Sequence, residues 1–461
     1  MNFKYFIFTL IASFAVASLS AQENKLSLSL EEAQEIALQH NKELENVRQD
    51  VNIAIEQYKQ ARGQGLPQID GTVDYMTNFN YEAAFSFGGG AGDAPQIDYT
   101  LLDAGDLEIL KLLQGSGEPA TTSIKLTDQS NAQIQLSQLI FGGQYWVGLQ
   151  TAKIAQDLAR KNVVLTELDV KENVANTYQL ILASEEIMQV LLDNIDNLKA
   201  IQQHTKNMYE AGLAEQTDVD QISISVSQLE NQHKSMDRNI RLSYNMLRYQ
   251  MGVNFDQQIE LTSSMDQILD ELIATNSLTQ EFNLNNNVSF QLIETQLDLQ
   301  EKMVDMEKWA YAPTLVGFYS YTKKIKTSGF DISPNNAAGL NLNIPIFSSG
   351  IRKANLSKAK IELDKVERSR DMVEEQLLLQ NNQLRTDFTN AFENYQTQRD
   401  NVTVAKRVLE SMQHKYRQGL ISSLDLTQTN TSFLEAESNY LNAAIELMQA
   451  HLKLKKLYNQ L

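Results

Sequence analysis

The sequence predicts a mainly α-helical chain with a smaller amphipathic β part, and the whole arrangement occurs twice. Three observations predict this fold class. Apolar residues recur at steps of three, four or seven over long stretches without proline, which is typical of coiled-coil helices. All 6 prolines fall in two windows, 66–122 and 313–345, where apolar and polar residues alternate as they do in strands. Finally, matching segments recur at constant offsets, which indicates an internal duplication.

Two long helical hairpins are expected, over residues 142–252 and 348–461. The first seam comprises Val170, Val174, Ile181, Met188, Leu191, Ile195 and Leu198. The second comprises Leu384, Phe388, Ala391, Tyr395, Val402, Ala405, Leu409, Met412 and Tyr416. At roughly 1.5 Å per residue, a helix from Gly143 to Tyr209 is expected to be on the order of 100 Å long. Such a helix crosses or lines something, although a soluble structural coiled coil remains an alternative.

The two hairpins match each other at an offset of 207 residues. The turn 209–213 recurs as 416–420, and the segment 152–154 recurs as 359–361. A first-repeat helix, expected over 22–65, opens with a capping box at Ser29 and Glu32. Its copy, expected over 278–312, lies 246 residues later, with Ser277 and Gln280 repeating the box, Asn287 matching Asn41 and Pro313 matching Pro67. The chain is therefore interpreted as two copies of one unit.

Each copy is expected to carry one β-hairpin, over 66–141 and over 313–347. The alternating apolar positions of the first copy are Ile69, Val73, Tyr75, Phe79, Tyr81, Ile124, Leu126, Ile134, Leu136 and Ile140. Those of the second are Leu315, Tyr319, Tyr321, Leu340, Leu342, Ile344 and Ile346. A long loop, 82–122, is expected in the first hairpin, with Gly88-Gly89-Gly90 and a short helix over 107–113, and a short polar loop, 327–336, in the second. Both loops are expected to face outward. The connecting segment 253–277 is expected to be irregular and to pack on the outside of the helices.

Four amphipathic strands are too few to close a sheet within one chain. In lipid, each unpaired backbone group at a sheet edge costs several kcal/mol, so other copies of the chain would have to complete the sheet. A soluble sandwich escapes this argument and remains an alternative. The aromatic residues expected to form membrane-interface belts are Tyr75, Phe79, Tyr81, Tyr319 and Tyr321.

The first 21 residues are expected to form a secretory signal peptide, with cleavage after Ala21. The sequence has no cysteine, so neither a disulfide framework nor a lipid-modified N-terminal cysteine is expected. No later segment has the apolar length of a transmembrane helix. The formal net charge of −19 argues against nucleic acid or anionic lipid headgroups as partners. That charge fits a solvated acidic surface or, alternatively, a cation-attracting interior.

The sequence contains no motif that would indicate catalysis. The 5 histidines are scattered, and no metal-binding spacing, nucleophile elbow or phosphate-binding glycine loop is present. We therefore expect neither an enzyme nor a bound cofactor or metal.

The order of these features, occurring twice, resembles the TolC family of outer-membrane efflux and secretion ducts. The resemblance rests on the segment 28–33, the strand-to-helix junctions 140–143 and 344–347, and the paired Tyr-x-x-Gly-Leu turns. It implies a homotrimer in the cell outer membrane, with a twelve-strand β-barrel and a periplasmic α-helical tunnel. It also implies docking to a periplasmic adaptor and an inner-membrane pump, so that the duct passively conducts small molecules or polypeptides to the exterior.

The same resemblance implies a periplasmic gate at the helix tips. The family places an aspartate nine residues after the turn tyrosine, and Asp425 follows Tyr416 at that spacing. A second acidic position of the family is Gln428 here. In the first copy, Asp218 and Gln221 follow Tyr209 in the same way. One acidic ring, or two from Asp425 and Asp218, is implied, but a first-turn carboxylate that caps its own helix explains the aspartates equally well.

The turns themselves are Gly212-Leu213 and Gly419-Leu420, which the resemblance implies are adaptor-docking tips. A plain helix cap explains the glycines without any partner. The main alternative function is a periplasmic coiled-coil adaptor or scaffold without a pore. Two hairpins in tandem with amphipathic strands disfavour it, because an adaptor would carry one hairpin inserted into small β domains.

Overall fold

The computed structural model describes residues 25–79, 81–87, 120–275, 281–327 and 333–461, together with Asp103, Gly105 and Glu108. The signal peptide, the Gly88-Gly89-Gly90 segment, most of the helix expected at 107–113 and the capping box at Ser277 and Gln280 lie outside the described residues. The chain divides into two compact units, each described by itself below. The first comprises residues 1–57, 151–302 and 359–461, and the second comprises 58–150 and 303–358.

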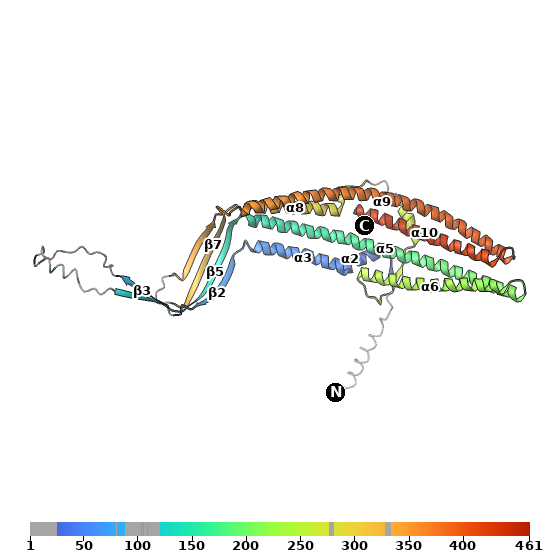
Figure 1. The fold of residues 1–461 in the computed structure, drawn as a ribbon, viewed down its shortest axis with the longest axis horizontal. Coiled ribbons are helices and arrows are strands. Elements are labelled where there is room, and N and C mark those ends of the chain that lie inside the picture. The colour runs from blue at the N-terminus through green and yellow to red at the C-terminus, as the bar shows by residue number, and fades with distance from the viewer. Residues whose placement is uncertain are drawn as a thin grey trace, which may run out of the picture. The chain divides into compact units, whose positions relative to one another are not determined.

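Long helices dominate the first unit (Figure 1). The principal elements are α5 (Gly143–Glu210), α6 (Gln216–Met251), α9 (Ile351–Arg417) and α10 (Ser423–Leu457). The shorter elements are α2 (Leu30–His40), α3 (Lys42–Gly63), α7 (Met265–Thr275), α8 (Val288–Trp309) and a 3-10 turn (Leu284–Asn286). The ends of α3, α5, α8 and α9 belong to the second unit. The predicted hairpin helices are thus confirmed, with α5 paired to α6 and α9 paired to α10 at their turns.

The expected apolar seams form the core of this unit. Near the turns, residues from all four long helices make one cluster: Leu191, Ile195, Leu198, Ile201, Ile222, Val226, Leu229, Leu409, Tyr416 and Leu426. A second cluster places Leu269 and Leu272 of α7 against Phe388 and Leu447. Burial of such side chains contributes about 1.5–3 kcal/mol each, so the seams hold both hairpins together. In the part of the chain that the structure describes, no helix combines the length and the apolar character needed to cross a bilayer.

The connecting segments are more regular than the sequence analysis expected. The first-repeat helix, expected over 22–65, is broken at Asn41 and is preceded by β1 (Leu26–Leu28). The segment 253–277, expected to be irregular, holds β6 (Ile259–Leu261) and α7, and β6 pairs in parallel with β1. The buried Tyr178 explains part of this order, because its hydroxyl donates to the carbonyl of Leu28 at 2.9 Å and accepts from the amide of Ser263 at 3.2 Å.

The duplication is visible in the contacts of two asparagines. Asn41 accepts from the amide of Leu44 at 3.0 Å and donates to the carbonyl of Gln250 at 2.7 Å. Asn287 accepts from the amide of Phe290 at 3.2 Å and donates to the carbonyl of Leu457 at 2.9 Å. Each asparagine therefore caps the start of one helix and satisfies a carbonyl near the end of another, which fixes where the helices meet.

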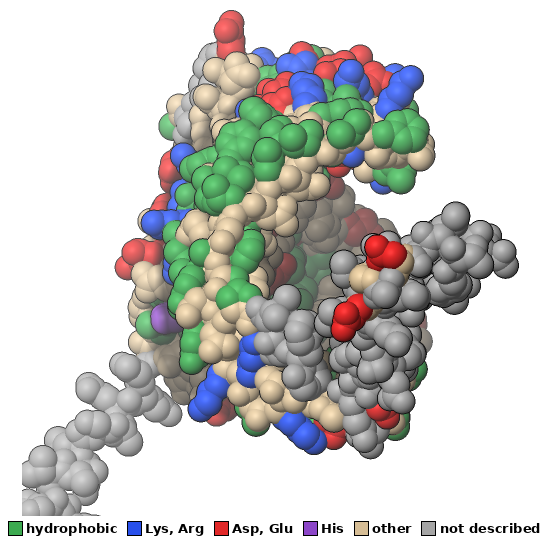
Figure 2. All heavy atoms as spheres, turned by 90° about the vertical axis from the view of Figure 1, so that its left-hand side faces the viewer, with side chains coloured by type: hydrophobic (Ala, Val, Ile, Leu, Met, Phe, Trp, Pro, Cys, Tyr) green, Lys and Arg blue, Asp and Glu red, His purple; other side chains and the backbone are tan. Residues whose placement is uncertain are grey.

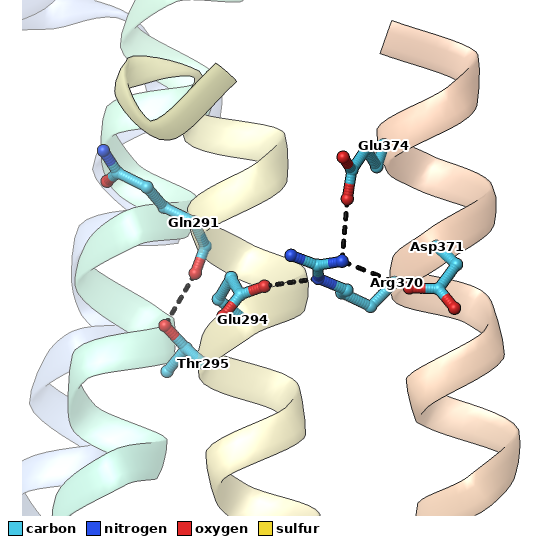
Figure 3. A network of polar contacts seen from close by, with 6 residues as sticks. All are labelled: Gln291, Glu294, Thr295, Arg370, Asp371 and Glu374. Atoms are coloured by element: carbon cyan, nitrogen blue, oxygen red, sulfur yellow. Dashed lines mark hydrogen bonds and ion pairs between the residues drawn. The ribbon is translucent and has the colours of Figure 1, made fainter. Parts of the chain in front are cut away.

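A polar network ties α8 to α9 in the same unit, and the sequence analysis missed it (Figure 3). The guanidinium of Arg370 contacts Glu294 at 2.7 Å, Glu374 at 2.7 Å and Asp371 at 3.1 Å. Across α8, the ammonium of Lys161 donates to the Thr295 hydroxyl at 2.5 Å. The network thus links α5, α8 and α9.

The second unit is built on a four-stranded antiparallel sheet of order β2-β5-β7-β8. Its strands are β2 (Gln68–Met76), β5 (Gln129–Gly142), β7 (Thr314–Lys326) and β8 (Asn336–Asn343). The pairing of β5 with β7 joins the two copies of the duplicated unit within one sheet. Of the described strands, none pairs with the outer edge of β2 or of β8.

The sheet has one apolar face and one polar face, as the alternation predicted. Opposed residues share a face, so Ile69, Leu136 and Tyr319 form one row across three strands. Asp70, Gln135 and Ser320 form the neighbouring row on the other face. The apolar positions are exposed, with Ile69 at 72% and Val73 at 76%. Figure 2 shows hydrophobic side chains gathered in patches on the surface that faces the viewer, next to areas of backbone and uncharged polar side chains.

Three details of the predicted hairpins were wrong. The alternation from Ile69 to Tyr81 predicted one strand, but β2 ends at Met76, and the turn after it holds Phe79 in a left-handed backbone conformation with a φ of 47°. Beyond this turn the chain pairs again, as β3 (Tyr81–Phe87) with β4 (Ala120–Leu126), so the loop expected over 82–122 begins and ends with strand. The strand expected to reach Ile346 ends at Asn343, just before Pro345, which has no amide hydrogen to donate.

The paired asparagine caps generate the first prediction. Asn287→Ala and Asn41→Ala each remove a cap and leave a helix-end carbonyl without its partner, so we expect each to lower the free energy of unfolding by about 1–3 kcal/mol. Thermal unfolding of the purified chain, followed by circular dichroism, measures the change. The matched control is Asn46→Ala, at an exposed position of α3, which we expect to alter stability by less than about 0.5 kcal/mol. Equal losses in all three variants would contradict the structural role of the junction asparagines.

Candidate functional site

The two helix turns have the same backbone geometry. Gly212 and Gly419 have φ values of 73° and 72°. The amide of Leu213 donates to the carbonyl of Met208 at 2.8 Å, and that of Leu420 donates to Lys415 at 3.0 Å. The two glycine amides donate to the carbonyls three residues back, so these are Schellman caps, in which glycine is favoured because it adopts a positive φ without strain. The caps account for both glycines.

The leucines that follow are not explained by the caps alone. Leu213 is 74% exposed and Leu420 is 67% exposed, and the neighbouring Leu424 is 64% exposed. Within the first unit, the tip of each hairpin therefore presents an apolar side chain to its surroundings. Such a side chain is suited to contact with another protein surface.

Both candidate gate aspartates occupy the third position of a helix. Asp425 accepts from the Ser422 amide at 3.2 Å and from the Ser422 hydroxyl at 2.8 Å. These bonds hold the pKa of the exposed Asp425 carboxyl below its usual range. The cap therefore contributes stability at neutral pH, and that stability is lost as the pH falls through the lowered pKa. Asp218 makes the same reciprocal box with Glu215, whose amide lies 3.1 Å from the carboxylate.

The structure brings the two tips together through Asp218. Its second carboxylate oxygen accepts from the hydroxyl of Ser423, at the start of α10, at 2.5 Å. Ser423 is buried, whereas the position that matches it in the first copy is Gln216, which donates to Asp220 instead. Asp218 therefore joins α6 to α10, and Asp425 has no equivalent partner among the described residues.

A second tie links α5 to α9 through Tyr416. Its hydroxyl lies 2.7 Å from that of Thr205, and both side chains are buried. Since Thr205 donates its own hydrogen to the carbonyl of Ile201 at 2.9 Å, the tyrosine is the donor in this pair. Burial raises the pKa of the Tyr416 phenol, so it stays protonated. The matching Tyr209 is 43% exposed, and the position that matches Thr205 in the second copy is Met412.

The two predicted glutamines of the tips form no hydrogen bond between the hairpins in the described structure. Gln428 is exposed on α10, one turn beyond Asp425, and Gln221 is half-buried on α6. The sequence analysis singled out the tyrosines and aspartates but missed their partners, Thr205 and Ser423. The sequence did mark these partners, because Thr205 and Ser423 differ in chemistry from Met412 and Gln216, the residues at the matching positions of the other copy.

The predicted interface aromatics divide into two groups. Tyr319 and Tyr321 lie on the apolar face of the sheet, and Tyr75 lies on the same face of β2. All three are exposed, at 45%, 43% and 67%. Phe79 lies in the turn between β2 and β3, and Tyr81 begins β3. The apolar face of the four-stranded sheet thus carries Tyr75, Tyr319 and Tyr321, but not Phe79 or Tyr81, of the predicted interface aromatics.

No arrangement in the described residues suggests metal chemistry: histidine and carboxylate side chains do not converge there in groups of three or more. The tips are built from caps, ties and exposed leucines. These groups hold helices against one another and leave apolar side chains exposed for contact with another protein surface.

Comparison with known proteins identifies the family. The model of the family described as outer membrane efflux protein matches residues 33–253 and 282–460. The chain belongs to the outer membrane efflux protein family. Membership confirms the resemblance to the TolC family of ducts and the predicted fold class of long helices with a β part. No curated protein sequence matches the chain.

Solved outer-membrane channels share the fold of this outer membrane efflux protein at low sequence identity. VceC from Vibrio cholerae is 15% identical, with a TM-score of 0.68 over 93% of this chain and 96% of that one. The Campylobacter jejuni CmeC channel is 14% identical, with a TM-score of 0.68 over 94% and 85%. The open state of the Neisseria gonorrhoeae MtrE channel is 16% identical, with a TM-score of 0.66 over 93% and 88%.

The asymmetric tyrosine pair generates the second prediction. Tyr416→Phe removes a buried hydrogen bond between α5 and α9, so we expect amide hydrogen exchange at residues 416–420 to become about 2- to 10-fold faster. Tyr209→Phe is the matched control, because the exposed phenol of Tyr209 makes no such bond among the described residues. We expect no change there. Equal acceleration in the two variants would show that the tie does not hold the tips.

Proposed function

We propose that the chain is the outer-membrane exit duct of a tripartite efflux or type I secretion system. In this role it passively conducts small molecules or polypeptides from the periplasm to the exterior. It does so when docked to a periplasmic adaptor and an inner-membrane pump. The observation that carries the proposal is the four-stranded sheet of a family member, with one exposed apolar face, one polar face and two edges that no described strand covers.

Closure of this sheet is the reason for proposing a homotrimer. Strand direction alternates across the order β2-β5-β7-β8, so β2 and β8 of one chain run in opposite directions. The β8 strand of one copy and the β2 strand of the next can therefore pair as antiparallel strands. Three copies supply twelve strands, an even total within the range of bacterial barrels. The apolar face then contacts outer-membrane lipid and the polar face lines a water-filled lumen, while the hairpins α5–α6 and α9–α10 form the periplasmic tunnel.

The domain assignment follows from this arrangement. Residues 66–141 and 313–347 form the membrane part, and residues 142–252 and 348–461 form the tunnel. Residues 22–65 and 278–312 supply the shorter helices, and residues 253–277 form an equatorial segment. Residues 1–21 are the proposed signal peptide.

The tips are the proposed gate. The two intrachain ties, from Tyr416 to Thr205 and from Ser423 to Asp218, hold one hairpin against the other and so favour the closed state. Asp425, exposed and ionised, is proposed to supply the acidic ring, with Gln428 facing the same passage. Asp218 and Gln221 belong to the closing contact, because the Asp218 carboxylate is already bound by Ser423.

The adaptor is proposed to dock at Leu213 and Leu420, the exposed leucines beside Gly212 and Gly419. Contact there displaces the tips and strains the two ties, which gives the adaptor a route to open the gate. The alternative, a periplasmic adaptor or scaffold without a pore, leaves the exposed apolar face of the sheet without a role. It remains testable by fractionation, because a duct stays with the detergent-extracted outer membrane.

The third prediction concerns conduction. In planar bilayers the purified chain should form trimeric pores that favour cations over anions, because charged rings set ion selectivity at a constriction. Asp425→Asn should lower the cation preference severalfold. The matched control is Asp220→Asn, an exposed carboxylate of the first copy that is bound to Gln216 and should leave selectivity unchanged. Pores that prefer anions would exclude Asp425 from the gate, and a chain that forms no pores would favour the adaptor alternative.

A further inference from the structure

Of three successive rows on the apolar face of the sheet, only the third carries a charge. Successive rows across the sheet on this face are Ile69–Leu136–Tyr319, Gly71–Ile134–Tyr321 and Val73–Ala132–Lys323. The first two rows hold no charged group, and the third ends on Lys323, which is exposed. The sheet therefore changes from apolar to cationic one row beyond Tyr321, about 7 Å farther along the strand.

The other lysines at this end of β7 are already engaged. Lys324 points to the polar face, opposite Asn131, and donates to the carbonyl of Ser333. The pairing shifts between Ser130 and Asn131, so Ile325 is unpaired, and Lys326 beyond it forms an ion pair with Asp128 at 2.8 Å. Among the described residues, Lys323 has no hydrogen-bond acceptor or carboxylate partner. Within the described part of the chain it is therefore an unpaired cation on the apolar face.

The position of Lys323 identifies the kind of partner it fits. It lies at the end of β7 that is farthest from α8, which under the proposed function is the exterior side of the membrane. A lysine next to a tyrosine row extends its ammonium toward the headgroup level while its stem stays along the apolar surface. Lipid headgroups at that level carry phosphate, and a lysine at an anionic lipid surface is attracted to it.

The net charge of the chain argues against a general attraction to anionic lipid headgroups, but the local charge at Lys323 is positive. The whole chain carries a formal net charge of −19, and the polar face of β2 bears Asp70 and Asp74. A chance surface charge would therefore more often be acidic. The three rows named above on the apolar face contain no carboxylate, and the charge they contain is positive.

We propose that Lys323 binds a phosphate group of the outer-leaflet lipid and so fixes the height of the sheet in the membrane, an inference that rests on the proposed function. The partner is a phosphorylated glycolipid headgroup in the bilayer, held by an ion pair to Lys323. Tyr321 packs one row below, against the lipid chains.

The fourth prediction tests this site by native mass spectrometry on the assembled full chain in detergent. The probes are diphosphoryl lipid A, the same lipid after removal of its phosphates, and inorganic phosphate alone. We expect the phosphorylated lipid to bind about fivefold more tightly than the dephosphorylated one. Lys323→Gln should abolish that preference, and Lys323→Arg should keep it.

Lys324→Gln is the matched control, because it removes a neighbouring lysine from the opposite face of the same strand and should leave the preference unchanged. Equal binding of the two lipids, or equal effects of the two glutamine variants, would overturn the inference. Displacement of the lipid by inorganic phosphate at equal concentration would also overturn it, since a site for soluble anions would then explain Lys323. If pores still form and conduct in bilayers, only this inference fails and the proposed duct stands. If the chain never assembles, both fail.

Discussion

The outer edges of β2 and β8, which no described strand covers, are the constraint on which the rest of this structure depends. A sheet whose apolar face is exposed and whose edge strands keep free backbone groups is unstable by itself in lipid, because water is absent there to satisfy those groups. The antiparallel order β2-β5-β7-β8 brings opposite strand directions to its two edges, so identical copies can pair without any change of fold. Under the proposed function, the chain therefore completes its sheet only by pairing with copies of itself.

The duplication supplies two similar hairpins, but their differences are what tie the tips together. The Schellman caps, the aspartate boxes and the junction asparagines occur in both copies with the same geometry. The contacts of Tyr416 with Thr205 and of Ser423 with Asp218 occur once. Under the proposed function, these two hydrogen bonds separate the closed arrangement of the tips from an open one. Breaking such bonds costs about 1 kcal/mol each, which is within reach of a docking partner.

Periodicity and offset were sufficient to predict the long helices, their turns, the two-faced strands and the fold class, because these features depend on spacing along the chain. The failures came from contacts across the chain. The pairing of β1 with β6 and the hydrogen bonds of Tyr178 involve residues far apart in sequence, and no local pattern marks them. The network around Arg370 also depends on which faces of α8 and α9 meet. At the tips, the aspartates were found from a resemblance, whereas Ser423 and Thr205 required coordinates. The strand break at Phe79 arises from one backbone conformation that neighbouring residues do not require.

Closure of the sheet by other copies is tested most directly by covalent trapping of its edges. The sequence has no cysteine, so single cysteines introduced along β2 and along β8 of the same chain give an unambiguous background. With one cysteine in each edge strand, mild oxidation of the membrane-embedded protein should produce covalent products that end at three chains, and only for pairs of matching register. Cross-links confined to a single chain, or a ladder that continues past three, would contradict a closed trimeric sheet.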